Sequence, residues 1–260
     1  MTATPRLETL TRAGFAARGV MYGLIGFLAL KTGRTEDGAG AMRFLSEGSG
    51  KLVLAVMAVG FIGYGIWRIA EAAFDSEGHG SDAKGVAVRA GGAVSGVIHF
   101  ILAYLAARLA MGSGGGGGNS AQESTATALD LPGGALLVGL AGAALLAVGA
   151  FQLVKAVRGD FLKQLDQRAA GQDWVKWLGR AGYAARGIVF LLMGWFLAQA
   201  GFSADAGEAG GMGEALSALP PTLRLVVAAG LFLFGLFSFV EARHRRIADH
   251  NVAGRLKAMT

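Results

Sequence analysis

Ionisable side chains that stand within long apolar stretches are the residues of this sequence most able to do chemistry. They are Arg18, Glu71, His99, Arg186 and Glu241. A histidine in an apolar segment can carry protons or bind a metal or haem. A lone arginine or glutamate is costly in such a place, so it usually faces other helices and finds a partner there. The sequence therefore raises two questions: what His99 does, and which charges pair.

The elements that hold these residues are six apolar runs. Of the 260 residues, 53% are hydrophobic and 16% are charged, whereas about a quarter of a soluble domain is charged. Each run is long enough to cross a bilayer as a helix of roughly 20 residues, and no proline falls inside one, so we expect unbroken helices. The runs are 13–31, 52–74, 90–111, 133–157, 181–200 and 222–241.

An internal repeat organises these runs. The octapeptide Arg12-Ala-Gly-Phe-Ala-Ala-Arg-Gly19 recurs almost unchanged as Arg180-Ala-Gly-Tyr-Ala-Ala-Arg-Gly187, and a degenerate copy begins at Arg89. Each copy opens a unit of two spans, with boundaries near 1–85, 86–175 and 176–260. Because two is an even number of crossings, the three units insert in the same orientation. The prediction is an all-α membrane protein of three parallel two-helix repeats, for which a pseudo-three-fold bundle is the simplest arrangement.

The alignment of the repeats suggests how the charges pair. The first helices carry Arg18, Ser95 and Arg186 at one position, and the second helices carry Glu71, Lys155 and Glu241 at another. The middle copy lacks both its arginine and its glutamate. We therefore predict structural ion pairs within each hairpin, Arg18 with Glu71 and Arg186 with Glu241. The alternative is that these charges anchor helix ends and extend toward lipid headgroups.

His99 takes the position of Tyr22 and Phe190 in the other repeats. A histidine hydrogen-bonded across helices in an aromatic slot is the interpretation we favour over a proton carrier or a metal or haem ligand. We expect no catalytic, cofactor-binding or metal-binding residues, because the sequence lacks a phosphate-binding loop, a nucleophile elbow, zinc-ligand spacing and any cysteine. We therefore expect no enzyme activity and no cofactor.

Lysine and arginine are distributed unevenly between the two sides of the predicted membrane. With the N-terminus inside, 18 of them lie on the inner side and 6 on the outer side, which favours cytoplasmic N- and C-termini. The net charge of +6 therefore suits a membrane protein, and we expect no nucleic-acid partner. The basic cluster Arg243–Arg246 could contact anionic lipid. Among the loops, 158–178 is expected to be an amphipathic interfacial helix broken near Gly171, and 112–128 and 202–215 to be flexible linkers.

The tandem Arg-Ala-Gly-(Phe/Tyr)-Ala-Ala-Arg-Gly motif, followed by Tyr22 or Phe190, resembles a family of bacterial membrane proteins known as domain of unknown function 1206. The resemblance covers the chain from Arg12 to about Ala242 and weakens in repeat 2, at Gly92, Val94 and Ser95. It implies a location in the bacterial inner membrane and three two-helix repeats, and it implies no activity.

Three functions stay open at this point. The first, which we favour, is a structural or interaction role in the membrane, with lipids and a protein partner, supported by glycine-lined helices and few buried ionisable groups. The second is a small-solute or ion transporter or channel along the repeat axis. The third is a membrane redox or metal-binding subunit that uses His99.

Overall fold

The computed structural model describes residues 5–75, 78–113 and 120–247. Six of its helices are long and apolar enough to cross a membrane, as the sequence predicts. The end of the basic tail, with Arg255 and Lys257, lies outside the described residues, as does the glycine run that begins at Gly114. The six helices are α1 (Pro5–Thr32), α3 (Lys51–Phe74), α4 (Ala83–Ala110), α6 (Gly134–Arg158), α8 (Asp173–Ser203) and α10 (Pro221–His244).

Local sequence sets where these helices begin and end. The side chain of Asp82 accepts a hydrogen bond from the backbone N–H of Gly85 and caps the start of α4. Pro221 occupies the first turn of α10, where its missing N–H removes no helical hydrogen bond. Gly159 ends α6 in the left-handed conformation, with φ of 73°. No described proline interrupts a span, so the helices run continuously.

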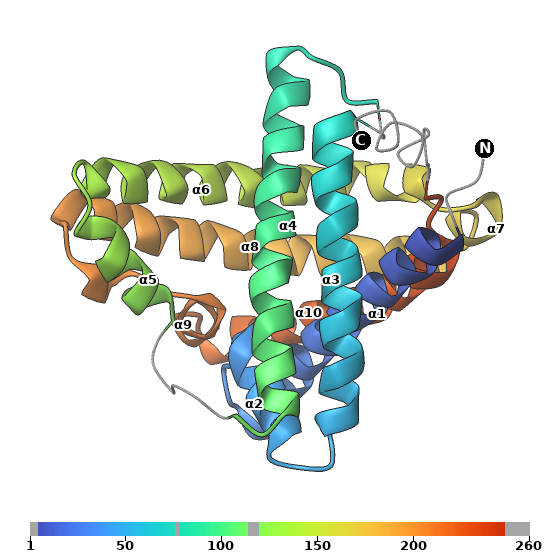
Figure 1. Cartoon of the computed structure of the whole chain (residues 1–260), viewed down its shortest axis with the longest axis horizontal. Helices are drawn as coiled ribbons and strands as arrows, with labels where there is room; N and C mark the ends of the chain where they lie inside the picture. Colours follow the sequence, from blue (N-terminus) through green and yellow to red (C-terminus); the bar gives the residue numbers. More distant parts are fainter. Residues whose placement is uncertain (1–4, 76–77, 114–119, 248–260) are drawn as a thin grey trace.

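The six long helices contact one another in series. Extensive contacts join α4 to α3, α3 to α1, α1 to α10, α10 to α8 and α8 to α6. No such extensive contact joins α4 to α6, the two helices of repeat 2. In Figure 1 the α3/α4 pair runs vertically, the α6/α8 pair runs horizontally, and α1 and α10 lie obliquely between them. The series of contacts therefore begins at α4 and ends at α6, and the predicted pseudo-three-fold bundle is not closed between the two helices of repeat 2.

Each tight helix pair joins the second helix of one repeat to the first helix of the next. At the crossing, a glycine of each helix faces the backbone of the other, and a Cβ on any of them would lie 2.8–3.1 Å from its partner's carbonyl oxygen. Small residues thus let the helices approach closely, as expected of membrane helices. The pairs are Gly235 with Gly19, Gly65 with Gly96, and Gly149 with Gly187. Because these glycines occupy aligned positions, the three interfaces are equivalent.

Contacts within a repeat depend on a second set of aligned residues. In repeat 1 Phe15, Tyr64 and Trp67 pack ring against ring, with centroids 5.2–5.6 Å apart. In repeat 3 their counterparts are Tyr183, Phe234 and Phe237, which also pack together and contact Phe161. Repeat 2 has Gly92, Val148 and Phe151 at these positions.

Repeat 2 has therefore lost the aromatic cluster that joins its two helices. Val148 and Phe151 are exposed, whereas Tyr64 and Trp67 of repeat 1 are buried. Gly91 meets nothing on the partner helix, although the aligned Gly14 packs against the backbone of α3. Because neither ring stacking nor close backbone approach connects α4 to α6, the two helices of repeat 2 are not packed against each other.

The loop predictions are wrong in part. The break predicted near Gly171 is present between α7 and α8, but before it the segment 158–178 forms two short elements instead of one helix. These are the 3-10 helix η1 (Asp160–Gln164) and the short helix α7 (Gln167–Ala170), and the first turns of α8 follow the break. Phe161 and Leu165 of this segment are buried, because they close the core beneath α8 and α10. The expected linkers contain α5 (Ser120–Leu129), η2 (Ala206–Glu208) and α9 (Met212–Ser217), and α9 buries Met212 and Leu216. The remaining helix, α2 (Gly38–Ser46), follows α1.

Candidate functional site: arginines between the repeats

The first arginine of each octapeptide binds the end of a helix from the neighbouring repeat. Arg12 donates to the carbonyls of Ala242 and Arg243 at 2.9 and 2.8 Å, at the end of α10. Arg89 donates to Ala72 at 2.8 Å, at the end of α3. Arg180 donates to the carbonyl of Val157, at the end of α6. The last carbonyls of a helix have no partner within the helix and carry partial negative charge, so these guanidinium groups cap three equivalent helix ends.

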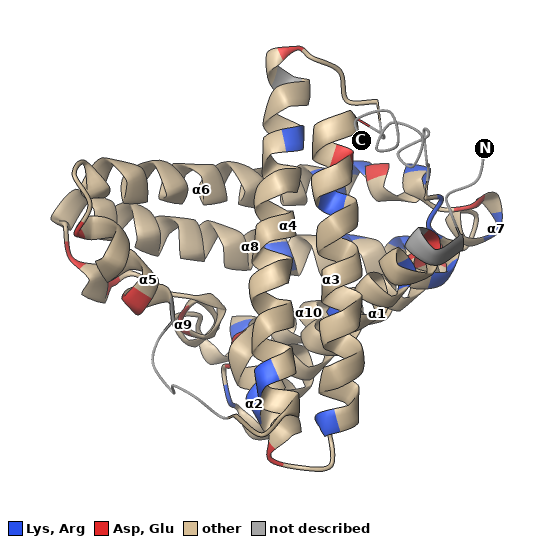
Figure 2. Ribbon diagram, viewed as in Figure 1, with Lys and Arg blue, Asp and Glu red and all other residues tan. Residues whose placement is uncertain are grey.

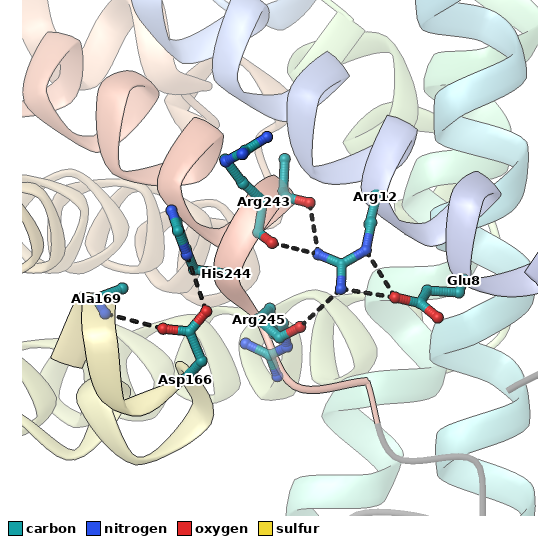
Figure 3. A network of polar contacts seen from close by, with 8 residues as sticks. Glu8, Arg12, Asp166, Ala169, Arg243, His244 and Arg245 are labelled. Carbon is teal, nitrogen blue, oxygen red and sulfur yellow. Dashed lines mark hydrogen bonds and ion pairs between the residues drawn. The ribbon is translucent and has the colours of Figure 1, made fainter. Parts of the chain in front are cut away.

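The cap on α10 belongs to a larger polar network at the arginine-rich end of the helices (Figure 3). Arg12 is held by Glu8 of its own helix at 2.7 Å. Asp166 accepts hydrogen bonds from the backbone N–H of Ala169 and from His244, each at 2.9 Å. These hydrogen bonds hold the pKa of the Asp166 carboxyl below its usual range. The network thus ties the end of α10 to α1 and to the α7 turn.

The basic cluster predicted to contact lipid takes part in this network. Arg245 is buried and donates to Gln164 at 2.6 Å and to Glu241 at 3.0 Å. Arg246 donates to the carbonyl of Lys163 at 2.6 Å. Arg243 keeps an exposed side chain. Two of the arginines therefore hold the chain itself together, and anionic lipid stays a predicted partner for the exposed groups.

The second arginine of the octapeptide lies deeper, between helices. Arg18 is buried and forms an ion pair with Glu241 of α10. Its Nε donates to Ser238 Oγ and its Nη1 to Tyr64 Oη, both at 3.2 Å. The predicted pairs are therefore wrong: Arg18 pairs with Glu241 and not with Glu71, and Arg186 does not pair with Glu241. Glu71 instead pairs with Arg68 at 3.2 Å and lies 3.4 Å from His79.

The physical reason for this error is that ion pairing follows the interfaces between repeats. Since α1 packs tightly against α10, Arg18 meets the second helix of repeat 3. At the aligned positions of the other two tight interfaces, α4 and α3 carry Ser95 and Glu71, and α8 and α6 carry Arg186 and Lys155. One of three equivalent positions therefore carries complementary charges.

Arg186 consequently has no carboxylate partner among the described residues, and its buried Nε has no hydrogen-bond acceptor. Its guanidinium lies over aromatic faces instead, with Cζ 4.4 Å from the ring centroid of Phe234 and 5.2 Å from that of Tyr22. Arg18 lies 5.2 Å from the same Phe234 ring. Lys155 Nζ lies 4.6 Å from the ring centroid of Tyr183. The two arginines thus flank one phenylalanine, and Glu241 is bonded to Arg18 and not to Arg186.

His99 is buried close to these arginines. Its Nδ1 lies 2.7 Å from the carbonyl oxygen of Ser95, and its ring packs on Tyr64 with centroids 4.3 Å apart. Because a carbonyl oxygen can only accept, Nδ1 carries the proton, and Nε2 of the neutral ring is an acceptor. Nε2 is buried and has no partner. The histidine therefore lies among aromatic rings, as the sequence predicts. The predicted hydrogen bond across helices is wrong, because Nδ1 bonds a carbonyl of its own helix.

Several residues of this cluster are absent from the sequence predictions, among them Tyr64, Ser238 and Phe234. The aligned position of Tyr64 and Phe234 carried a signal, because it is aromatic in repeats 1 and 3 and is Val148 in repeat 2. Figure 2 shows that charged residues lie mostly toward the helix ends and in loops, with few in mid-helix. The small number of mid-helix charges makes the buried Arg18–Glu241 pair, with Arg186 beside it on the Phe234 ring, the most distinctive polar feature of the long helices.

Comparison with known families agrees with this repeat architecture. The model of the family Domain of Unknown Function (DUF1206) matches the chain three times, at residues 13–75, 90–159 and 181–245. The chain belongs to the DUF1206 family. Each match covers one predicted repeat and contains two of the long helices.

One relative extends the family comparison over almost the whole chain. It is the "Uncharacterized protein YxxB" of Bacillus subtilis (strain 168), which is 34% identical over 256 residues, covering 94% of this chain and 93% of its own length. No solved structure matches. These DUF1206 relationships support the fold, and the function has to be argued from the geometry.

Proposed function

We propose that this DUF1206 protein has a structural and interaction role in the bacterial inner membrane, and that it acts as a self-associating unit through its open repeat. The observation that carries the proposal is the unpartnered seam of repeat 2. We define this repeat-2 seam as Gly91 and Val94 of α4 together with Ala144, Val148 and Phe151 of α6. All five residues are exposed.

The corresponding surfaces of the other repeats are protein–protein contacts. Gly14 and Gly182, the counterparts of Gly91, are buried against the second helix of their repeats. Gly60 and Gly230, the counterparts of Ala144, lie on those second helices and are buried against the first helix. The seam thus keeps the small residues that membrane helices use for close approach. The two surfaces that would form such a contact, one on α4 and one on α6, are therefore both present in the seam.

A second copy of this chain is the occupant that fits both halves. A two-fold axis along the membrane normal would bring α4 of one copy to α6 of the other, and α6 to α4, so that the interface is self-complementary. Such an axis keeps both copies in the same orientation. The paired helices would remain antiparallel, as they are within each closed repeat. Each copy would then complete the open hairpin of its partner.

The absence of cysteine from the sequence makes disulfide cross-linking a clean test. Gly91→Cys and Ala144→Cys are made in separate, differently tagged copies and expressed together in membranes. We expect an interchain disulfide between the two tags, because close helix approach brings Cα atoms within disulfide range. Val226→Cys in repeat 3 serves as the matched control, since it is 63% exposed and lies outside the seam; it should give no cross-link with Ala144→Cys.

Two results would contradict the second copy as occupant. A purely intrachain disulfide in the Gly91→Cys/Ala144→Cys double variant would mean that repeat 2 closes on itself. Cross-linking of Ala144→Cys to a different membrane protein, without cross-linking to its own kind, would identify a heterologous partner. The transport and redox interpretations stay predictions, and the continuous helices disfavour transport.

The orientation that we propose places both termini in the cytoplasm. The excess of lysine and arginine on that side supports it, as does the position of the capping arginines Arg12, Arg89 and Arg180 at one end of the helices. A C-terminal green fluorescent protein fusion should fluoresce, and a C-terminal alkaline phosphatase fusion should be inactive. The opposite pattern would place the basic end outside.

A further inference from the structure

We propose that the basic end of α10 forms, together with α1 and the α7 turn, a binding site for the headgroup of an anionic phospholipid. Arg246 and Arg243 would bind the phosphate group, and the glycerol part of the lipid would lie against Trp174. The site shares no residue with the repeat-2 seam, and binding there does not depend on self-association.

Two cavities meet at this end of the molecule, and His244 lines both of them. The first, which we call the basic cavity, has a volume of about 300 Å³ and is lined mainly by charged residues, among them Glu8, Arg12, Asp166, Arg243 and Arg246. The second, which we call the tryptophan cavity, has a volume of about 220 Å³, and its lining includes Arg168, Trp174, Val175 and Val240. Because the cavities have His244 in common, one ligand with a charged end and an apolar end can occupy both.

The charges around the basic cavity favour an anion. Four arginines and two carboxylates line it. The carboxylates are already bonded, Glu8 to Arg12 at 2.7 Å and Asp166 to His244 at 2.9 Å. Two of the arginines have no carboxylate partner within the described part of the chain, Arg243 and Arg246. A bound phosphate group would supply the negative charge that complements them.

The hydrogen-bond donors of these two exposed arginines are available to a phosphate group. The guanidinium of Arg12 is engaged by Glu8 and by carbonyls at the end of α10, so it contributes charge alone (Figure 3). Arg246 uses Nη2 for the carbonyl of Lys163 at 2.6 Å, and its guanidinium makes no other hydrogen bond among the described residues. The side chain of Arg243 makes none with them. A guanidinium with free N–H groups can bind two phosphate oxygens at once.

The site lies at the level of the lipid headgroups. Three candidate membrane spans have an end here, because two of them begin at Glu8 and Asp173 and the third ends at His244. Trp174 lines the tryptophan cavity and is 57% exposed, and tryptophan is enriched where membrane helices meet the headgroups. Basic pockets at such helix ends suit anionic headgroups. A ligand held in the membrane reaches this level directly, which favours a phospholipid over a soluble anion.

Lipid binding to the full-length protein tests the site. The protein is purified in a non-ionic detergent and titrated with phosphatidylglycerol and, as the control lipid without net charge, phosphatidylcholine; bound lipid is measured by native mass spectrometry. Binding of radiolabelled inorganic phosphate is measured in parallel by equilibrium dialysis. We expect phosphatidylglycerol to bind more tightly by about tenfold or more. Equal binding of the two lipids would overturn the proposal. Saturable phosphate binding without a preference between the lipids would also overturn it, because the ligand would then be a soluble anion.

Substitutions at the exposed arginines test whether the phosphate group lies in the basic cavity. Arg246→Gln should weaken phosphatidylglycerol binding by about tenfold, because a charge-assisted hydrogen bond is lost. Arg224→Gln is the matched control and should leave binding unchanged, since Arg224 also donates to backbone carbonyls, at 2.9 and 3.1 Å, but at the opposite end of α10. An unchanged preference for phosphatidylglycerol in Arg246→Gln would refute the site. If Arg246→Gln lowers the melting temperature, Arg243→Gln decides in the same way, because the Arg243 side chain makes no bond within the described part of the chain.

The tryptophan cavity is tested separately. Trp174→Ala should weaken binding of both lipids by a similar factor, because it removes the apolar wall against which the glycerol part would lie. Trp177→Ala is the control, since Trp177 is also on α8 and is 64% exposed but lines neither cavity. Weaker binding in Trp177→Ala than in Trp174→Ala would place the lipid outside the tryptophan cavity and contradict the proposal.

Discussion

Ion pairing across the α1/α10 interface can be tested by a double-mutant cycle with Arg18→Met and Glu241→Gln. Each single change should cost about 3–5 kcal/mol of unfolding free energy, because it leaves the other member of a buried pair uncompensated. Arg18 would also lose its hydrogen bonds to Ser238 and Tyr64. The double variant loses both charges together, so its cost should fall below the sum of the two single costs.

The difference between the summed single costs and the cost of the double variant is the interaction energy, and its size shows which helix Arg18 contacts. For contacting charges we expect an interaction energy of about 1–3 kcal/mol, above the average of about 0.6 kcal/mol measured for interhelical hydrogen bonds in a membrane protein. The cycle of Arg18→Met with Glu71→Gln should be additive within about 0.5 kcal/mol, because Glu71 is bonded to Arg68. Both cycles have one arginine in common, so the second controls for effects on α1 alone.

Equilibrium unfolding in mixed micelles of dodecyl sulfate and a non-ionic detergent, followed by circular dichroism, measures each free energy under one set of conditions. A larger interaction energy in the Arg18/Glu71 cycle than in the Arg18/Glu241 cycle would show that pairing occurs within the hairpin. Additivity in both cycles would show that Arg18 is held by its aromatic neighbours alone.

Further predictions concern packing, capping and pH. Gly235→Ala should lower the unfolding free energy by about 1–3 kcal/mol, because the added Cβ would meet the backbone of α1 at 2.6 Å. Gly23→Ala is the control and should be tolerated in the same unfolding assay, because its Cβ would meet nothing within 4 Å. Arg12→Gln should cost about 1–3 kcal/mol, because it removes charge-assisted hydrogen bonds to the end of α10; an unchanged midpoint would contradict the capping role. The pKa of Asp166 is lowered in the folded protein, so its contribution to stability is present above the ordinary aspartate pKa of about 3.9 and is lost as the pH falls through the lower folded value. Asp166→Asn should therefore flatten the stability curve in that acidic range, and an unaltered curve would contradict the prediction.

Much of the fold could be predicted from the sequence because it depends on local properties. Apolar length and the absence of proline from the runs fix the number of spans, and the recurrence of the Arg12–Gly19 octapeptide fixes the repeats. The loops were harder, because α5 and α9 are short helices that form by packing against the long ones. Their small residues, such as those around Ala215, resemble a linker until a surface is present to bury them.

The charge pairs could not be predicted because a tandem repeat is compatible with two different pairings of its helices. The first helix of a unit can meet the second helix of its own unit or that of the preceding one, and the aligned positions are the same in both cases. The joint loss of an arginine and a glutamate in repeat 2 suggested pairing within the hairpin. In the structure, Ser95 lies on α4, which packs against α3, and Lys155 lies on α6, which packs against α8. The two changes therefore fall in different interfaces and did not compensate each other.

The divergence of repeat 2 accounts for both unusual features of the molecule. Loss of the aromatic partners at Gly92 and Val148 leaves the hairpin open, and the lysine at position 155 leaves Arg186 without a carboxylate. The first change removes ring packing within repeat 2, and the second removes a carboxylate from the helix that packs against α8. The open seam and the arginine without a carboxylate partner are therefore separate consequences of one diverged copy.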